Sequence, residues 1–248
     1  SKVKRCYSVG LEENNEFFAA RKISRKLNKK ISLVSIKKKK LKSTWKYLTK
    51  LKNEPISVPN EGLIYLVCKK MSKQNKIVLT GEGADEIFFG YDKIFRWALN
   101  QKKFNLKRFI ELYGYSNVIK PTSRFIRYIK NLSRKKKVID FIEDFFYDFH
   151  LPTLLRRMDF ASMAASKEAR VPFVSKNIIE NLYRVSPKIK IDENISKKPL
   201  RNYIKNINLD FILETKKIGF SAATEIEQKK DYNNSDLQNI VIKTFKNE

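Results

Sequence analysis

The residues best suited to chemistry lie close together between Thr80 and Tyr91. This stretch reads Thr-Gly-Glu-Gly-Ala-Asp-Glu-Ile-Phe-Phe-Gly-Tyr and holds three of the seven glycines in the chain. Glycine lets a backbone approach a ligand closely, and the start of a following helix offers N–H donors to an anion. The spacing therefore favours a loop that binds a phosphate-bearing ligand.

Three carboxylates stand in the same loop, on Glu82, Asp85 and Glu86. Carboxylates repel phosphate unless a cation bridges the two, so this composition favours Mg²⁺. The Gly-x-Gly-x-x-Glu pattern departs from the dinucleotide fingerprint at its last glycine, where Glu86 stands. Acidic residues at the start of a helix explain the same pattern without a ligand, because the helix dipole favours negative charge there. The spacing alone leaves both interpretations open.

The elements that must position this loop form a β-α-β-α-α-β order over the first 80 residues. We predict strands over 3–9 and 31–36, a helix over 15–27 and another that opens at Pro59. The apolar run over 76–80 predicts a buried parallel strand. In such doubly wound sheets, ligands bind at the carboxyl ends of strands, where the loop begins. After Tyr91 strand signals nearly vanish, and residues 93–213 are predicted to form several helices.

Two further stretches are dense in functional residue types. Residues 157–173 read RMDFASMAASKEARVPF and predict a helix that ends before Pro172, on which Glu168 and Arg170 could form a structural ion pair. Residues 216–220 read KKIGF, two lysines before a glycine turn. Neither stretch indicates a particular reaction alone.

Taken in order, these stretches resemble motifs of the synthetase domain of the glutamine-dependent asparagine synthetase family. VLTGEGADEIFFGY resembles the family's strand followed by Ser-Gly-Glu-Gly-x-Asp-Glu, and RMDFASMAASKEARVPF resembles its Asp-x-x-Ser-Met-x-x-x-x-Glu-x-Arg-x-Pro-Phe segment. KKIGF is similar to Lys-x-Gly-Phe, and the run from Lys197 to Arg201 to Lys-x-x-Leu-Arg. The resemblance covers roughly residues 3–222.

The resemblance implies an α/β fold with a parallel sheet of the adenine-nucleotide α-hydrolase, or ATP pyrophosphatase, type, followed by a mainly helical half. It implies domain boundaries at 1–92 for a partial nucleotide-binding portion, 93–222 for a helical portion and 223–248 for a polar tail. The implied reaction uses ATP and Mg²⁺ to adenylate the side-chain carboxylate of aspartate, and ammonia from glutamine then attacks the adenylate.

The resemblance also implies roles for single residues. Val9, Thr80, Gly81 and Gly83 would bind ATP, Val9 through backbone contacts to adenine. Asp85 would hold Mg²⁺.

Two further roles follow for the chemistry. Glu82 would act at the adenylate intermediate, and Lys217 would neutralise charge on the leaving pyrophosphate. Asp159, Glu168 and Arg170 would be structural or lie on the substrate side.

The first strand of the implied sheet is not in this chain. Residues 8–13 (SVGLEE) look like a decayed Ser-Gly-Gly-x-Asp-Ser phosphate loop, but Ser8, Val9 and Gly10 match the family's second strand. The phosphate loop would then lie one strand and helix upstream, and the glutamine-cleaving domain further upstream. We therefore expect this chain to be incomplete and inactive alone, and to have those upstream segments of the same protein as partners.

Several departures from the family pattern leave the acceptor open. Phe173, Val174 and Ser175 replace Phe-Leu-Asp, and Thr215 replaces an arginine. Relatives with this core make β-lactams, cyclise peptides or amidate sugars. A catalytically inactive binding or regulatory remnant of the fold is a further alternative.

Composition narrows the remaining classes. The net charge of +27 suggests nucleic-acid binding, but the basic residues are spread along the whole chain and no reading element is recognisable, so we expect no nucleic-acid partner. No apolar run is long enough to span a bilayer, and no signal peptide is recognisable. Two isolated cysteines, Cys6 and Cys68, favour a reducing cytoplasm. His150 is the only histidine, which argues against His-based zinc sites and Ser-His-Asp catalysis.

Overall fold

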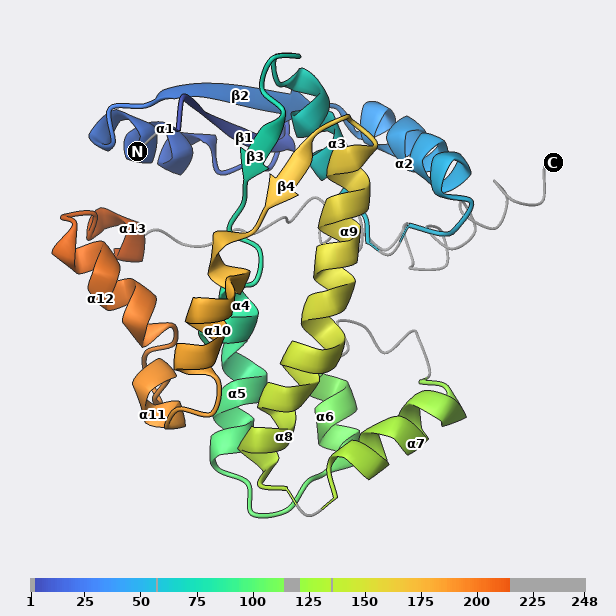
Figure 1. Cartoon of the computed structure of the whole chain (residues 1–248), viewed down its shortest axis with the longest axis vertical. Coiled ribbons are helices and arrows are strands. Elements are labelled where there is room, and N and C mark those ends of the chain that lie inside the picture. The colour runs from blue at the N-terminus through green and yellow to red at the C-terminus, as the bar shows by residue number, and fades with distance from the viewer. Residues whose placement is uncertain (1–2, 57, 114–120, 135, 215–248) are drawn as a thin grey trace. The chain divides into compact units, whose positions relative to one another are not determined.

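The structure is a computed structural model that describes residues 3–56, 58–113, 121–134 and 136–214 (Figure 1). The chain divides into two compact units. The first comprises the described residues of Ser1–Val78, Arg157–Arg170 and Ile207–Glu248, and the second those of Leu79–Arg156 and Val171–Asn206. The expected tail over 223–248 lies outside the described residues.

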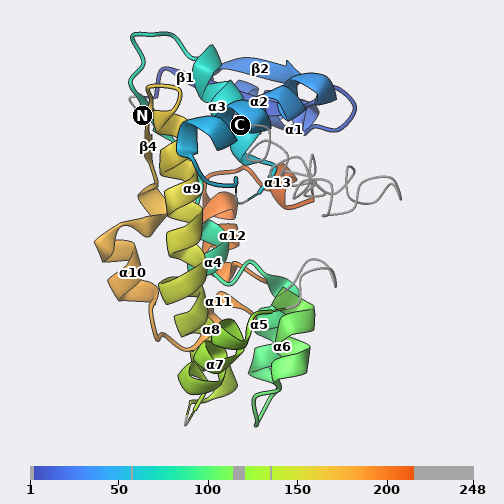
Figure 2. The same ribbon diagram turned by 90° about the vertical axis from the view of Figure 1, so that its right-hand side faces the viewer.

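The first unit begins as the sequence predicts, with a parallel strand pair and its crossover helix. Strand β1 (Arg5–Leu11) pairs in parallel with β2 (Lys30–Ile36), and Val9 lies opposite Val34. Helix α1 (Phe17–Lys26) connects them and contacts both strands. These elements are blue in Figures 1 and 2. The predictions for 3–9, 15–27 and 31–36 are confirmed to within two residues at each end.

Helices α2 (Lys38–Lys52) and α3 (Glu61–Lys70) complete the core of the first unit. Leu41, Trp45 and Leu48 recur at helical spacing on α2 and are fully buried. Gly62 of α3 lies so close that an added Cβ would be 2.6 Å from Leu41 Cδ1. This close approach requires glycine, and it packs the two helices against one another.

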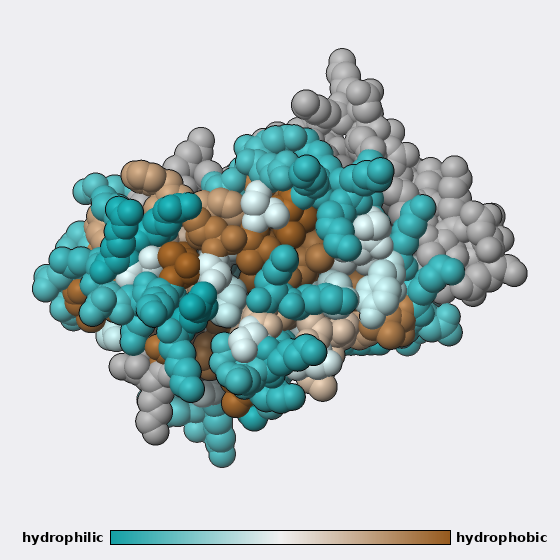
Figure 3. Space-filling model, turned by 90° about the horizontal axis from the view of Figure 1, so that it is seen from above, coloured by the Kyte–Doolittle hydropathy of each residue, from teal (hydrophilic) through white to brown (hydrophobic). Residues whose placement is uncertain are grey.

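Strand β3 (Ile77–Leu79) is present where the sequence predicts a strand over 76–80, but the predicted burial of this strand is wrong. Ile77 and Leu79 are each 55% exposed, and β3 pairs only with β4 (Glu168–Arg170) in a separate two-stranded sheet of the described chain. The apolar run therefore lacks, among the described residues, the neighbours that would cover it. Figure 3 shows one face of the molecule on which apolar residues gather between hydrophilic ones.

The helix predicted over 157–171 ends early, which is a second correction. Helix α9 (Leu151–Met163) stops because Ser166 adopts a left-handed backbone (φ 56°). The Ser166 N–H donates to Met163 O at 2.8 Å and the Lys167 N–H to Ser162 O at 3.0 Å, the two bonds of a Schellman motif. The chain then extends, and the Glu168 N–H donates to Lys76 O at 2.8 Å to form the second sheet.

The second unit is helical, as predicted for residues 93–213. Its described elements are α4 (Ala84–Ile87), α5 (Asp92–Leu99), α6 (Leu106–Tyr113), α7 (Ser123–Leu132), α8 (Val138–Phe145), η1 (Phe146–His150), η2 (Pro172–Val174), α10 (Lys176–Leu182), α11 (Pro187–Lys190) and α12 (Lys198–Asn206). Helix α13 (Phe211–Glu214) belongs to the first unit. No helix among the described residues is long and apolar enough to cross a membrane.

Aromatic rings form the core of the second unit. The ring of Phe89 stacks on that of Phe95 at a centroid distance of 4.0 Å, and Phe109, Phe141 and Phe145 pack edge to face or tilted beyond them. All five are fully buried. Because buried rings carry a large apolar area, this cluster fixes the segment that contains Phe89.

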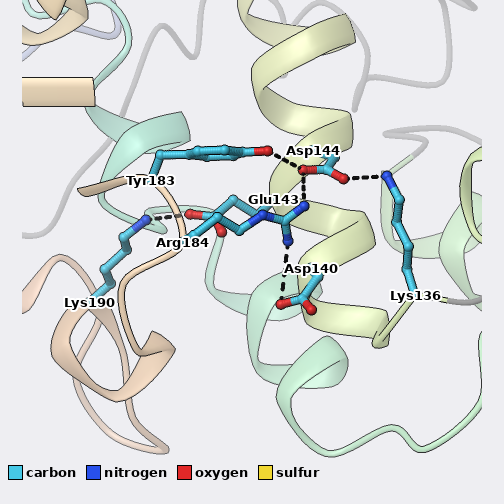
Figure 4. Close-up of polar contacts among 7 residues, drawn as sticks. All are labelled: Lys136, Asp140, Glu143, Asp144, Tyr183, Arg184 and Lys190. Carbon is cyan, nitrogen blue, oxygen red and sulfur yellow. Dashed lines mark hydrogen bonds and ion pairs between the residues drawn. The ribbon is translucent and has the colours of Figure 1, made fainter. Parts of the chain in front are cut away.

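A network of charged side chains lies beside this core (Figure 4). Asp144 of α8 accepts hydrogen bonds from Tyr183 at 2.7 Å, from Arg184 at 2.6 Å and from Lys136 at 2.5 Å. Arg184 also pairs with Asp140 at 3.4 Å. Burial opposes ionisation of Asp144, but these donors outweigh it and lower the pKa of its carboxyl.

The most deeply buried charge of this network is Lys190 of α11. Its side chain is fully buried, its ammonium bonds Glu143 at 2.6 Å, and it lies 4.2 Å from the centre of the Phe89 ring. Burial lowers the pKa of Lys190 and raises that of Glu143, because desolvation opposes both charges. The pair and the ring contact offset this cost.

Candidate nucleotide-binding loop

The glycine-rich loop joins β3 to α4 as the sequence predicts. The Glu82 N–H lies 3.4 Å from Thr80 Oγ1, and the Ala84 N–H donates to Gly81 O at 3.3 Å, so the loop is a tight turn. Helix α4 has only four residues, and its dipole is correspondingly short.

Gly83 and Gly81 of this loop differ in whether the structure requires a glycine at their positions. Gly83 has φ +89°, and an added Cβ would lie 2.4 Å from Val174 Cγ2, so both backbone and packing require glycine there. Gly81 is exposed, and its nearest contact would be Phe173 at 4.0 Å. Packing does not demand glycine at 81, and the open space above its backbone would admit a ligand.

The three loop carboxylates do not share one environment, although the sequence places all three in one loop. Glu82 and Asp85 are partly exposed, whereas Glu86 is 1% exposed. Glu86 Oε1 accepts a hydrogen bond from Tyr91 OH at 2.6 Å. Burial raises the pKa of Glu86, and the nearby charges of Asp85 and Glu82 act in the same direction. Glu86 is therefore part of the protein interior.

The only histidine of the chain, His150, is partly buried and lies beside Glu86 and Tyr91. His150 Nε2 lies 3.0 Å from Tyr91 OH and 3.6 Å from Glu86 Oε1, and its Nδ1 lies 2.8 Å from Tyr113 OH. Tyr91, Tyr113 and His150 line a cavity of about 270 Å³ together with Phe146 and Gly90. The sequence signal for this network was the single histidine, which could not be assigned to partners 59 and 37 residues away.

Asp85, the expected Mg²⁺ ligand, has a lysine as its neighbour. Lys197 Nζ lies 2.5 Å from Asp85 Oδ1, and the two side chains are 24% and 28% exposed. Both pack over Gly90, where an added Cβ would lie 2.0 Å from Asp85 Oδ1 and 2.2 Å from Lys197 Cε. The described residues contain no group of three or more His, Cys, Asp or Glu that could hold a metal. A single carboxylate would fit a metal that arrives with phosphate ligands, provided that the lysine moves.

A short ordered loop brings Lys197 to this place. Asp192 Oδ1 accepts from the N–H groups of Ile195 at 2.7 Å and Asn194 at 2.9 Å, and Asp192 O accepts from Arg96 Nε of α5 at 3.1 Å. The bonds from the Ile195 and Asn194 N–H groups to the carboxylate, with a hydrogen bond from Lys198, lower the pKa of Asp192 to about 2. Lys197 follows with a left-handed backbone (φ 54°) and precedes α12.

We expect the Asp192→Asn variant to be less stable than the parent near neutral pH, and we expect this difference to shrink as the pH falls from about 4 toward 2. The pKa of Asp192 in the folded chain is lower than its ordinary value of 3.8. Its stabilising contribution is therefore complete above about pH 4 and is lost as the pH falls toward 2. Thermal unfolding of both proteins across this range measures the difference. A difference that stays constant down to pH 2 would contradict the assignment.

The other predicted site residues do not belong to the loop after β3. Val9 lies in the first unit, partly buried in β1. Asp159 is exposed on α9. Glu168 and Arg170 form the predicted ion pair at 2.7 Å on β4, where strand geometry puts residues i and i+2 on one face. Lys217 lies outside the described residues.

Comparison with known proteins gives a consistent family. The chain matches the model of the Asparagine synthase family over residues 2–244. It is 25% identical over 243 residues to Asparagine synthetase (glutamine-hydrolyzing) 3 of Bacillus subtilis (strain 168), covering 85% of this chain and 39% of that protein. It is 27% identical over 215 residues to Asparagine synthetase (glutamine-hydrolyzing) 1 of the same strain, covering 68% of this chain and 34% of that protein. The chain thus spans well under half the length of these curated relatives.

Proposed function

Because the chain belongs to the asparagine synthase family, we propose that it is the synthetase portion of an ATP-dependent amide-forming ligase. In this proposal ATP adenylates a carboxylate, with aspartate as the first candidate, and ammonia then displaces AMP. The main structural support for this proposal is the loop after β3, where Gly81 leaves open space beside two partly exposed carboxylates, Glu82 and Asp85. The family match over residues 2–244 supports the same proposal.

We assign nucleotide binding to Val9, Thr80, Gly81 and Gly83. Thr80 and Gly81 would contact the nucleotide at the end of β3, and Gly83 would shape the loop through its left-handed backbone. Val9 would contact adenine through its backbone at β1. ATP would supply the leaving group, and Mg²⁺ would neutralise phosphate charge with Asp85 as one protein ligand.

The chemical roles fall on one carboxylate and one lysine. Glu82 is partly exposed on the loop, where it can accept a proton from the attacking amine. Lys217 would stabilise charge that develops on the pyrophosphate, because a preorganised cation acts most strongly in the transition state. Asp159 is exposed on α9, and we keep it as a residue of structural or substrate-side role.

We further propose that the glutaminase and phosphate-loop segments lie upstream in the same protein. The curated relatives are named as glutamine-hydrolysing, and this chain covers only 39% and 34% of them. Among the described residues β3 has only β4 as a neighbouring strand, so its other edge suits pairing with a further strand. The expected inactivity of the chain alone follows from the same proposal.

The direct test is exchange of labelled pyrophosphate into ATP by the full-length gene product that contains this chain. We expect exchange that requires both Mg²⁺ and aspartate, since adenylation is reversible. Other carboxylates, such as β-amino acids and peptide acids, serve as alternative acceptors in parallel reactions. Exchange with another carboxylate but not with aspartate would identify a related amidotransferase. No exchange with any of them would favour an inactive remnant of the fold.

A further inference from the structure

We propose that Phe173 is a specificity-determining residue, whose ring closes one side of the ligand space over Gly81 and limits the size of the group that can lie there. Both residues belong to the second unit, Gly81 in the loop after β3 and Phe173 in η2. The inference rests on the proposed function for its consequence, which is selection of the acceptor carboxylate by size. It does not rest on that function for its geometry.

The contact distance shows how the ring bounds this space. Apart from the neighbours of Gly81 in the chain, the only described heavy atom within 4 Å of a Cβ built on Gly81 is Phe173 Cε2, at 4.0 Å. This distance is an ordinary van der Waals contact between two carbons. A group the size of a methyl therefore fits in this direction, whereas a larger one meets the ring. Phe173 is partly exposed, so its ring can contact a ligand.

Packing on both sides holds the Phe173 ring in place. The ring lies edge to face with the buried ring of Phe88, at a centroid distance of 5.8 Å. The next residue, Val174, places its Cγ2 only 2.4 Å from the position of a Cβ on Gly83. The Val174 N–H donates to Val171 O at 2.9 Å and closes the short turn. Moving the ring away from Gly81 therefore requires η2 to repack on the loop.

The chemistry of the ring favours selection by size. A phenyl ring has no hydrogen-bonding group, so it separates ligands by contact and not by charge. Glu82, next to Gly81 in the chain, presents a partly exposed carboxylate that disfavours a phosphate chain beside it. In the proposed adenylate, the acceptor is joined to the nucleotide through a single phosphate. The acceptor is therefore the part of the ligand whose size the ring tests.

The geometric test uses a thiol at position 81 of the full-length gene product. Gly81 has no left-handed backbone, and an added Cβ meets Phe173 at an ordinary distance, so Gly81→Cys should fold. The thiol is treated with N-methylmaleimide and, separately, with the bulky N-(1-pyrenyl)maleimide. Mass spectrometry of the peptide that contains residue 81 measures both rates, so other thiols do not contribute. Adding Phe173→Ala should lower the small-to-bulky rate ratio by at least about tenfold.

Two further variants control the labelling experiment. Tyr203→Ala in the Gly81→Cys background is the matched control, because it removes an exposed aromatic side chain from α12 of the same unit. It should leave the rate ratio unchanged. Phe173→Leu keeps an apolar side chain against Phe88, and it should lower the ratio in the same direction if Phe173→Ala does not fold.

The functional test is pyrophosphate exchange with acids of increasing bulk, namely aspartate, β-methylaspartate and β-benzylaspartate. We expect Phe173→Ala to raise kcat/KM for the bulkiest acid relative to aspartate by at least about tenfold, mainly through KM. A purely structural role would lower kcat/KM for every acid by the same factor. Tyr203→Ala should keep the parental preference.

Two results would overturn the inference. One is a labelling ratio that is the same in Gly81→Cys alone and after either change of Phe173. The other is a parallel loss of kcat/KM for all three acids in Phe173→Ala. Absence of exchange by the parent with any acid, together with the expected labelling, would instead contradict only the proposed function.

Discussion

The Glu82→Gln variant of the full-length gene product is expected to lose ammonia-dependent amide formation by roughly 10²–10⁴-fold, the usual worth of a positioned acid or base. Glutamine keeps the shape of the side chain but cannot take up a proton. Glu82 is partly exposed on a loop, and its N–H lies near Thr80 Oγ1, a backbone contact that the substitution retains. The melting temperature should therefore change by no more than a few degrees.

The control for Glu82→Gln is Glu180→Gln, an exposed glutamate on α10 that pairs with Lys176. This variant should keep the parental rate of amide formation and the parental stability. A near-parental rate of amide formation in Glu82→Gln would remove Glu82 from the chemistry. A fall in melting temperature as large as the fall in rate would show that Glu82 supports the fold instead.

The largest loss of stability is expected for Lys190→Met. Methionine fills a similar volume, but it leaves the Glu143 carboxylate buried without its partner at 2.6 Å. Removing one member of a buried ion pair costs about 3–5 kcal/mol, a large share of a typical unfolding free energy. The loss should be smaller at low pH, because the pKa of Glu143 is already raised and protonation would remove the unpaired charge. Urea unfolding at several pH values measures this.

A double variant separates charge from packing. Lys190→Met with Glu143→Leu removes both charges, and it should recover much of the stability that the single change loses. Lys188→Met on the same helix α11 is the control, since Lys188 is exposed and should change stability by no more than about 0.5 kcal/mol. If the double variant is less stable than Lys190→Met alone, the pair is not the reason for the loss.

Local sequence patterns predicted the parts of the fold that depend on local periodicity. The β1–α1–β2 unit follows from alternating and helical spacing within 32 residues, and the structure has it. The glycine turn after residue 80 follows from residue type, because Gly83 needs its positive φ. These features do not depend on distant partners.

The features that sequence analysis missed or predicted wrongly here depend on partners distant in sequence or on the backbone conformation of a single residue. Glu86 was grouped with Glu82 and Asp85 because the sequence does not show that Tyr91 and His150 enclose it. Sequence analysis identified Lys197 only as part of a segment similar to Lys-x-x-Leu-Arg. It could not predict the contact of Lys197 with Asp85, because the two residues are 112 positions apart in the sequence. Ser166 ends a helix through a left-handed conformation that serine adopts only occasionally.

The contacts that residues 158–170 make with residues 64–78 have a consequence for synthesis on the ribosome. Lys167 Nζ donates to Ser72 O at 2.8 Å, and Met158 and Ala161 pack against Ile64 and Cys68, so segments about 90 residues apart complete the first unit. At about 5–20 residues per second, roughly 5–20 s pass between the emergence of the two segments. During that interval Ile64 and Cys68 lack their later partners, and aggregation of the nascent chain is a hazard. A chaperone that binds apolar segments should therefore associate with ribosomes that have translated residue 78 but not yet residue 170.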